Sequence, residues 1–337
     1  MKIVIAGAGA IGGYIGACVA RAGGDVTLFA RGPHLEAMRT RGLRIVSPEG
    51  DFEVRPTVTG DLAAIGTCDV VFVGVKAHAL TALAPRLRAL FHADTVVVST
   101  QNGIPWWYFQ RHGGELQGLR LESVDPGGVI AASIEAERVV GSIAYFSTEI
   151  VEPGVIKHIE GNRLSLGEQD GSKSERCRRI AEALIPGGLR CPINPRFRHE
   201  IWVKLLGNVA FNPASALTRA TLVEMARHPE VSRLVREIMA EVEAVAAKLG
   251  LELPISIDQR MAGAEKVGAH KTSMLQDLEA GRPMELDPVV GAVVELSEKL
   301  GVSMPATRAV YACTKLLDER LRATSASAPP RPGAAVS

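Results

Sequence analysis

Residues 2–12 read KIVIAGAGAIG, and this stretch decides the fold. Residues 2–6 are apolar after Lys2 and rich in Val and Ile, which predicts a buried β-strand. The glycines that follow have the spacing G-x-G-x-x-G and lead directly into a helical pattern. Gly7 permits a tight turn, Gly9 lets a ligand approach the backbone, and Gly12 lets the helix pack close to the strand. The stretch therefore predicts the first strand, loop and helix of a Rossmann-type domain.

The phosphate groups of a dinucleotide are the ligand that this loop suits. The N-terminus of the following helix carries unpaired N–H groups and the positive end of the helix dipole, and both favour anions. A glycine-rich turn without a ligand is the alternative interpretation. The residues predicted to bind the cofactor here are Gly7, Ala8, Gly9, Ala10, Ile11 and Gly12.

Strands and helices continue to alternate through the first half of the chain. Further strand and helix patterns lie at residues 25–29, 33–41, 69–75, 79–90 and 95–100. Apolar strands separated by helices indicate a parallel sheet that is buried on both faces. Between about residues 113 and 168 short alternating segments replace this pattern and predict β-hairpin structure at the end of the sheet.

The second half of the chain is helical. Pro192 and Pro195 mark a break, after which helical patterns continue almost to the end. The expected helices span residues 200–210, 222–226, 229–249, 257–265, 288–300 and 305–322. Asp287 is expected to cap the helix that begins at Pro288.

These patterns predict an α/β Rossmann-type dinucleotide-binding domain followed by a C-terminal all-α domain. The Rossmann-like domain is expected over residues 1–192 and the helical domain over residues 193–322. The remaining residues, 323–337, are rich in Ala, Ser and Pro, and this composition predicts a disordered tail.

The charge balance excludes several classes of partner. The 337 residues include 38 Lys and Arg against 37 Asp and Glu. A nucleic-acid-binding protein usually needs a large basic excess, and so does a protein that binds an anionic membrane surface. The run at residues 1–20 is apolar, but glycines interrupt it and it leads straight into a second strand pattern, so we interpret it as folded structure. No uninterrupted apolar stretch elsewhere reaches the ~18 residues that a membrane helix needs. We therefore expect neither nucleic acid nor a membrane among the partners.

The cysteines indicate a reducing compartment. They lie at positions 18, 68, 177, 191 and 313, an odd number without CxxC spacing. Such a set is typical of reduced, mostly buried thiols, so we expect a cytoplasmic protein. The spacing does not suit a zinc site, and no metal is expected.

The end of the second strand indicates which dinucleotide binds. NAD-binding enzymes place Asp or Glu there to accept a hydrogen bond from the ribose 2′-OH. Here the strand ends in Phe29-Ala30-Arg31. A guanidinium attracts the 2′-phosphate of NADP with paired hydrogen bonds, whereas a carboxylate would repel it. Arg31 therefore predicts NADP(H), with a solvated surface arginine as the alternative.

Two further strand ends carry polar candidates. Lys76 directly follows the strand at 69–75, and Asn102 follows the strand at 95–100 after one residue. In open α/β sheets, ligands bind at the carboxyl ends of the strands. Loop lysines and Asn-Gly turns also occur without any function, so both readings stay open for these two residues.

The first helix of the second half carries a polar stripe. Lys204, Asn208 and Asn212 recur every four residues and therefore share one face of a helix whose flanks are apolar. Lys and Asn normally avoid burial unless they are paired. Such a stripe indicates either a functional face or a solvent-facing one. Ser273 and Glu285 are further candidates, with helix capping and an ordinary salt bridge as their alternatives.

Four features together resemble the ketopantoate reductase family (2-dehydropantoate 2-reductases). They are GAGAIG, the VKA and QNG strand ends, the helix E-x-W-x-K-L-x-x-N-x-x-x-N-P, and SMLQD followed by ELD, and they span residues 1 to about 320. The last two motifs are far more specific than the glycine loop. The resemblance implies a Rossmann domain, a helical domain and NADPH-dependent reduction of 2-dehydropantoate to (R)-pantoate, on the pathway to pantothenate and coenzyme A.

The resemblance also implies roles for individual residues. Lys204 resembles the catalytic lysine that donates a proton to the nascent alkoxide, and Glu285 resembles the acidic residue that holds this lysine and the substrate hydroxyl. Hydride transfer to a ketone carbon leaves negative charge on oxygen, which an ammonium group can stabilise and protonate. The positions that resemble substrate-binding residues are Asn102, Asn208, Asn212 and Ser273. The positions that resemble cofactor-binding residues are Arg31, Lys76 and Asn102.

Several alternatives remain open. Residues 104–128 look longer and more aromatic than in typical family members, and they could form a lid, a subunit contact or a surface insertion. They could therefore select another small 2-oxo acid. A non-catalytic NADP-binding redox sensor is a second alternative. An opine-type dehydrogenase would rely on a His–Asp pair, whereas His199 lies just outside the polar stripe. The oligomeric state is open, and a homodimer through residues 288–300 is one option.

Overall fold

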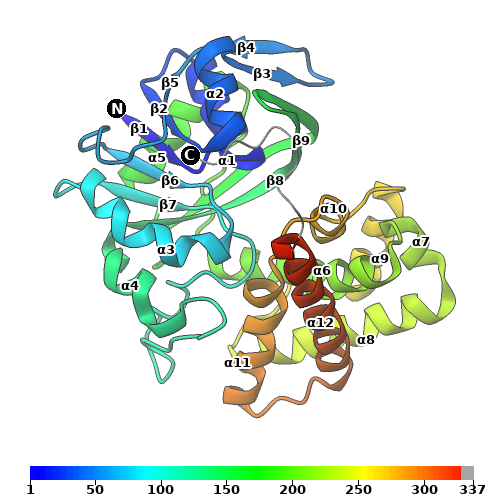
Figure 1. Cartoon of the computed structure of the whole chain (residues 1–337). Coiled ribbons are helices and arrows are strands. Elements are labelled where there is room, and N and C mark those ends of the chain that lie inside the picture. Colours follow the sequence, from blue (N-terminus) through cyan, green and yellow to red (C-terminus); the bar gives the residue numbers. More distant parts are fainter. Residues whose placement is uncertain (328–337) are drawn as a thin grey trace. The chain divides into compact units, whose positions relative to one another are not determined.

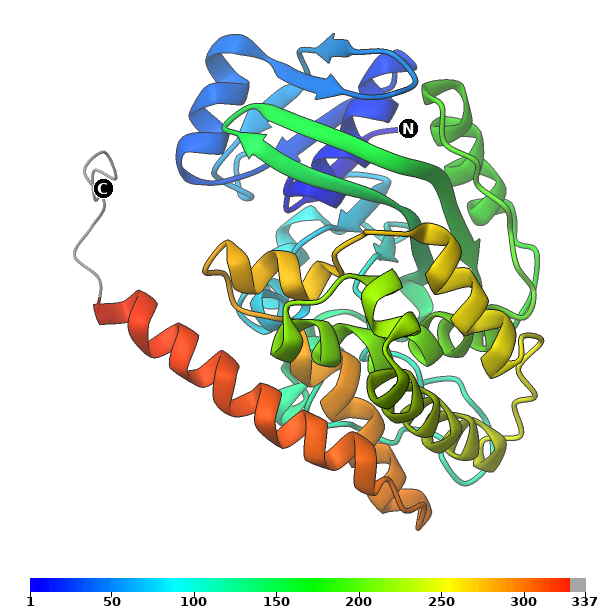
Figure 2. The ribbon, with the colours of Figure 1, turned by 90° about the vertical axis from the view of Figure 1, so that its right-hand side faces the viewer.

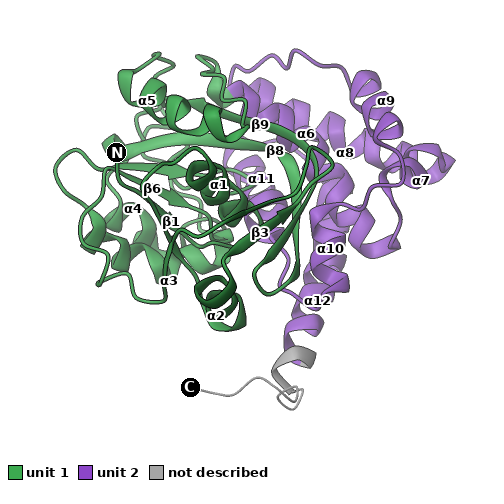
Figure 3. Ribbon diagram, turned by 90° about the horizontal axis from the view of Figure 1, so that it is seen from above, with its two compact units in different colours: residues 1–198 green, residues 199–337 purple. Residues whose placement is uncertain are grey.

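The computed structural model describes residues 1–327 of the chain. The chain divides into two compact units, Met1–Arg198 (unit 1) and His199–Ser337 (unit 2), and the boundary falls within the first turn of helix α6 (Phe197–Thr218) (Figure 3). None of the described helices is long and apolar enough to span a lipid bilayer.

Unit 1 is built on a sheet that has nine strands among the described residues, in the order β4-β3-β9-β8-β7-β6-β1-β2-β5 (Figure 1). The strands are β1 (Ile3–Ala6), β2 (Val26–Phe29), β3 (Leu43–Val46), β4 (Phe52–Val54), β5 (Thr57–Thr59), β6 (Val70–Val73), β7 (Val96–Ser99), β8 (Val139–Glu152) and β9 (Val155–Gly167). The neighbours from β5 to β8 all pair in parallel. The predicted parallel Rossmann-type sheet is therefore confirmed.

The central strands are apolar because both of their faces are covered. Every residue of β1, β2, β6 and β7 is buried. The helices of unit 1 are α1 (Ala10–Arg21), α2 (Gly32–Arg41), α3 (Ala77–Leu87), α4 (Val129–Ser133) and α5 (Glu175–Leu184). Ile5 and Phe72, for example, are fully inaccessible to solvent. Each such side chain contributes about 1.5–3 kcal/mol relative to an exposed position.

The predicted hairpin structure is two long strands, β8 and β9, joined at Pro153-Gly154 (Figure 2, in green). The register between them shifts near Tyr145, where Gly161 has φ +75° and a Cβ there would collide with the carbonyl oxygen of Tyr145. This irregularity interrupts the alternation of apolar and polar residues. The sequence therefore indicated several short segments, although the hairpin continues through them.

The aromatic residues of segment 104–128 are buried. Trp107, Tyr108 and Phe109 each expose 1% of their surface. The Trp107 ring stacks on Phe197 with centroids 6.2 Å apart, and Arg198 donates to the carbonyl oxygen of Tyr108 at 3.2 Å. These side chains belong to the packed interior, and their burial explains why this part of the segment is so apolar.

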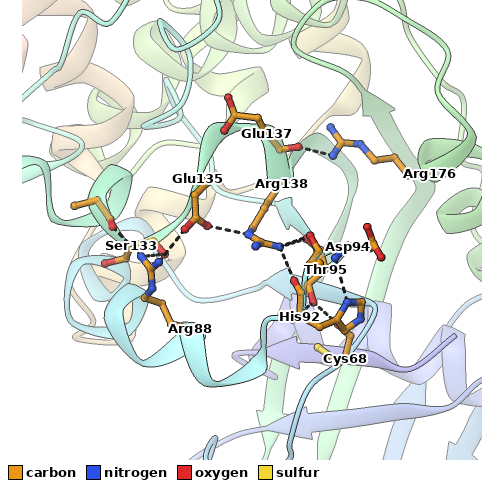
Figure 4. A network of polar contacts seen from close by, with 12 residues as sticks. Cys68, Arg88, His92, Asp94, Thr95, Ser133, Glu135, Glu137, Arg138 and Arg176 are labelled. Carbon is orange, nitrogen blue, oxygen red and sulfur yellow. Dashed lines mark hydrogen bonds and ion pairs between the residues drawn. The ribbon is translucent and has the colours of Figure 1, made fainter.

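A polar network closes the amino-terminal end of the sheet in unit 1 (Figure 4). Arg138 donates to the carbonyl oxygens of His92 (2.8 Å) and Thr95 (3.2 Å), immediately before β7. Glu135 accepts from both Arg138 (2.8 Å) and Arg88 (2.9 Å). The network ties the end of α3 to the segment after α4. It lies at the strand ends opposite to those where nucleotides bind in such sheets, so we assign it a structural role.

Unit 2 is all-α, as predicted. Its helices are α6 (Phe197–Thr218), α7 (Leu222–Arg227), α8 (Pro229–Lys248), α9 (Ile257–Val267), α10 (Ser273–Glu279), η5 (Asp287–Gly291, a π-helical turn), α11 (Ala292–Leu300) and α12 (Pro305–Ser327). Helix α12 includes the first residues of the predicted disordered tail, and residues 328–337 lie outside the described residues.

The prediction that Asp287 caps a helix is wrong. Its neighbour Leu286 already has helical dihedral angles, and Asp287 is the first residue of the π-helical turn. The Asp287 carboxylate instead accepts from the Tyr311 hydroxyl (2.7 Å) and from Lys315 Nζ (2.6 Å), both on α12. The Asp287 carboxylate therefore bonds to side chains on α12, and it does not cap the helix as the local sequence predicted.

Candidate active site

The glycine loop has the close packing that its spacing predicts. Gly7 has φ +110°, and a Cβ there would lie 2.5 Å from Val75 Cγ1. A Cβ at Gly12 would collide with the carbonyl oxygen of Gly7, and one at Gly74 would lie 2.6 Å from the same oxygen. The ends of β1 and β6 and the start of α1 therefore meet at one point, where only glycine fits.

Gly9 differs from these glycines because the space beside it is open. A Cβ built on Gly9 meets no protein atom within 4 Å. Gly9 is also the N-cap residue of α1, and no side chain caps this helix. An uncapped helix N-terminus with open space before it suits a phosphate group. The loop therefore fits the pyrophosphate of a dinucleotide.

Arg31 lies just beyond β2 with an exposed side chain. Its guanidinium carbon lies 5.6 Å from the centre of the Phe29 ring, and that of Arg86 on α3 lies 5.8 Å from the same ring. Two permanent positive charges thus flank the end of β2. Arg86 lies at the far end of a helix and outside any motif, so the sequence pattern did not indicate it.

Lys76 and Asn102 stand at the carboxyl ends of β6 and β7, as predicted, and both are partly buried. Lys76 is the N-cap residue of α3. Gln101, for which the sequence pattern predicted no role, connects the ends of β6 and β7. Its Nε2 donates to the carbonyl oxygens of Val73 (2.7 Å) and Val75 (3.1 Å). Gln101 therefore fixes the turn that carries Asn102.

The polar stripe of unit 2 lies on α6. Lys204 and Asn208 are partly buried, and Asn212 exposes 7% of its surface. Their apolar neighbours on the helix are fully buried or nearly so, which rules out a fully solvent-facing stripe. These neighbours are Ile201 at 5%, Trp202 at 0%, Leu205 at 1%, Leu206 at 0% and Val209 at 0%.

Lys204 has an unusual electrostatic environment. Loss of water around the ammonium group lowers the pKa of Lys204 from 10.5 to about 8. The carboxylates of Glu285 and Glu200 oppose this change by stabilising the charged form, and the guanidinium of Arg260 adds to it. Strongly perturbed pKa values are typical of functional groups. The structure thus brings Lys204 and Glu285 into electrostatic contact, and it adds Arg260, which the sequence analysis missed.

Glu285 sits in a segment that α12 holds on both sides. Before it, the Met284 N–H donates to the buried carboxylate of Asp318 at 2.9 Å. After it, Asp287 is held by Tyr311 and Lys315. Glu285 itself is partly buried, next to a π-helical turn of a kind that is frequent at functional sites. The fixed backbone on both sides limits where the Glu285 carboxylate can lie.

Ser273 is exposed and is the first residue of α10. The cap of this helix is Thr272, whose side chain accepts from the Leu275 N–H at 3.2 Å. The capping alternative for Ser273 is therefore wrong, and its hydroxyl is not used in that way. Asp277 forms an ion pair with Arg282 at 3.1 Å.

No group of three or more His, Cys, Asp or Glu side chains in the described part of the chain could hold a metal ion. Of the cysteines, Cys18, Cys68, Cys177 and Cys191 are buried free thiols, and Cys313 is an exposed one. Mostly buried, unpaired thiols are what the sequence analysis predicted.

A Rossmann-type sheet with a nucleotide loop, joined to a helical unit with a low-pKa lysine, defines a dinucleotide-dependent oxidoreductase. Residues 3–171 match the family described as ketopantoate reductase PanE/ApbA, and residues 196–318 match the family described as its C-terminal domain. The chain therefore belongs to the ketopantoate reductase family, as its motifs indicated.

Known relatives align over nearly their whole length. The 2-dehydropantoate 2-reductase of Mesorhizobium japonicum is 46% identical and aligns over 94% of this chain and 98% of its own. The solved 2-dehydropantoate 2-reductase of Methylococcus capsulatus is 30% identical with a TM-score of 0.80, over 95% of this chain and 98% of that one. A D-mandelate dehydrogenase shares the fold, with a TM-score of 0.81 over 96% of this chain and 99% of that one. Its sequence is 22% identical.

Proposed function

We propose that the protein reduces 2-dehydropantoate to (R)-pantoate with NADPH, a step in pantothenate and coenzyme A biosynthesis. The observation that carries this proposal is the 46% identity to a 2-dehydropantoate 2-reductase over almost the entire chain. The protein is an NADP-dependent oxidoreductase with a small 2-oxo acid as substrate. The Lys204 environment supports the same chemistry, because a reductase of ketones needs a proton donor.

Lys204 is the proposed general acid. NADPH, when bound, supplies the hydride to the ketone carbon, and the oxygen becomes negatively charged. The Lys204 ammonium stabilises this oxygen and then donates a proton from Nζ to it. With a pKa of about 8, the lysine is mostly protonated at neutral pH and gives up its proton more readily than an ordinary lysine. Glu285 orients the ammonium group and accepts from the substrate hydroxyl.

The remaining predicted site residues complete the proposal. The backbone of residues 7–12 binds the pyrophosphate, and Arg31 binds the 2′-phosphate. Lys76 lies at the nicotinamide end of the cofactor. Asn102 serves both cofactor and substrate, and the other proposed substrate-binding residues are Asn208, Asn212 and Ser273. We further propose a cytoplasmic location, which suits the free thiols. The homodimer stays a prediction.

The test is to follow NADPH absorbance with the purified protein and 2-dehydropantoate, beside a panel of other 2-oxo acids and an NADH control. Turnover with 2-dehydropantoate and NADPH that is much faster than with the other acids supports the proposal. Fast turnover of a different 2-oxo acid would keep the mechanism and reassign the substrate. NADPH binding without turnover of any acid would favour the redox sensor. Lys204→Ala is expected to lower kcat by roughly 10²–10⁴-fold.

A further inference from the structure

Helix α6 has a gap in its side-chain surface one turn after Lys204. The residue there is Gly207, which is buried. Glycine inside a helix costs about 1 kcal/mol relative to alanine, and such a glycine often marks the close approach of a neighbouring group. A Cβ at Gly207 would lie 2.5 Å from Cζ of Arg260 and closer still to two of its nitrogen atoms. The guanidinium of Arg260 therefore occupies the space that any other residue at 207 would fill.

This gap places the guanidinium beside Lys204. Residues three apart on a helix are surface neighbours, with Cβ positions about 5–6 Å apart. Lys204 and Gly207 are related in this way. Arg260 comes from α9 (Ile257–Val267) and packs onto α6 at this turn. Its charge is permanent, since a guanidinium does not lose its proton in a protein.

The charged groups around Lys204 have opposite effects on its pKa. Glu285, from the segment before η5, and Glu200, from the preceding turn of α6, favour the ammonium form. Arg260, from α9, disfavours it. With the two carboxylates alone the lysine would hold its proton more tightly. A general acid works best when its pKa lies close to the working pH.

We propose that Arg260, seated in the Gly207 gap, is a positioning residue that makes Lys204 a stronger acid. This inference rests on the proposed role of Lys204 as proton donor, and it adds a residue outside the site motifs. It explains why α6 carries a glycine in the middle of its catalytic stretch. It also assigns α9 a function, namely to hold a fixed charge against the catalytic helix.

The test measures the ionisation of Lys204 directly, in the full-length protein. The rate of acetylation of Lys204 by acetic anhydride is followed against pH by mass spectrometry, which gives its titration midpoint without any turnover. In Arg260→Gln the midpoint is expected to rise by on the order of one pH unit. The alkaline limb of the kcat/KM profile is expected to move upward with it. Arg260→Lys keeps the positive charge and should leave the midpoint close to the wild-type value. Gly207→Ala displaces the guanidinium and should raise the midpoint by an intermediate amount.

Arg236→Gln is the matched control. Arg236 also contacts α9, through an ion pair with Asp258 at 2.5 Å, and its removal changes the net charge equally. The inference is overturned if the Lys204 midpoint is unchanged in both Arg260→Gln and Gly207→Ala, or if Arg236→Gln moves it as far. Thermal unfolding of each variant identifies any that fail to fold. If Arg260→Gln is among them, Gly207→Ala, which displaces the guanidinium without removing it, carries the comparison. If Lys204→Ala retained full turnover, Lys204 would not be the proton donor, although the reductase activity itself would stand. The labelling midpoint would still show whether Arg260 acts on the ionisation of Lys204.

Discussion

Replacing Lys204 by methionine is expected to stabilise the protein at neutral pH while it removes the proton donor. Methionine has a similar length and fits the apolar surroundings on α6 without a charge. The pKa of Lys204 falls from 10.5 to about 8 on folding, and this fall corresponds to a cost of about 3 kcal/mol for carrying the charge in the folded state. The neutral side chain avoids this cost, so we expect a gain of up to about 3 kcal/mol at pH 7.

The pH dependence of this gain follows from the direction of the pKa change. Below pH 8 both the folded and the unfolded lysine are protonated, so the wild-type protein carries the full cost. Between about pH 8 and 10.5 the unfolded chain binds a proton that the folded one has lost, and wild-type stability rises with pH. The advantage of Lys204→Met should therefore shrink across this range and vanish near pH 10.5.

Urea unfolding followed by circular dichroism at pH 7, 8.5 and 10 measures these differences. Lys248→Met is the control, because Lys248 is an exposed residue at the end of α8, and its replacement should change stability by no more than about 0.5 kcal/mol. A Lys204→Met protein that is less stable than wild type at pH 7 would refute the reasoning. So would a gain of the same size at every pH, since that would reflect packing rather than charge.

Three further changes test other parts of the structure. Arg31→Ala should raise the KM for NADPH roughly 10- to 100-fold and leave that for NADH nearly unchanged, because only NADPH has a 2′-phosphate; steady-state kinetics with both cofactors would expose equal losses, which contradict the assignment. Gly12→Ala should weaken NADPH binding, because its Cβ would collide with the Gly7 carbonyl oxygen. Titration of NADPH fluorescence measures the affinity, and an unchanged affinity would contradict the close packing. Asp318→Ala should destabilise the protein by about 1–3 kcal/mol and lower kcat, because it removes the buried carboxylate that accepts from the Met284 N–H beside Glu285. Urea unfolding together with kinetics checks this, and wild-type values for both would contradict it.

The sheet could be predicted where burial makes the sequence simple. The strands β1, β2, β6 and β7 are buried on both faces and consist of little besides Val, Ile and other apolar residues. The strands β3, β4 and β5 were not predicted. They are partly exposed and lack a continuous apolar run. Their pairing also depends on distant partners; β3, for instance, pairs with β9. Local patterns carry no information about such partners.

The site was predictable where one residue type has a backbone role or a distinctive spacing. Gly7 and Gly12 stand where no side chain fits, and the stripe that begins at Lys204 follows the helical period. Arg260 and Gln101 could not be found in this way. Each acts through a partner on another element, and an arginine or a glutamine in a polar stretch has many ordinary uses. Gly207 was the available signal for Arg260, because a glycine within a strongly helical run indicates close approach by a neighbour.

The features that obscure the site in the sequence are the ones that give it its chemistry. Lys204 lies on a helix whose neighbouring residues are nearly all apolar and buried, so α6 resembles an ordinary core helix. The same apolar environment removes water from the ammonium group and lowers its pKa to about 8. A lysine on a solvated face would stay near 10.5 and would be a weaker acid at neutral pH. The stability cost of about 3 kcal/mol is therefore inseparable from the proposed catalytic role, since any change that removed the cost would also remove the acid strength.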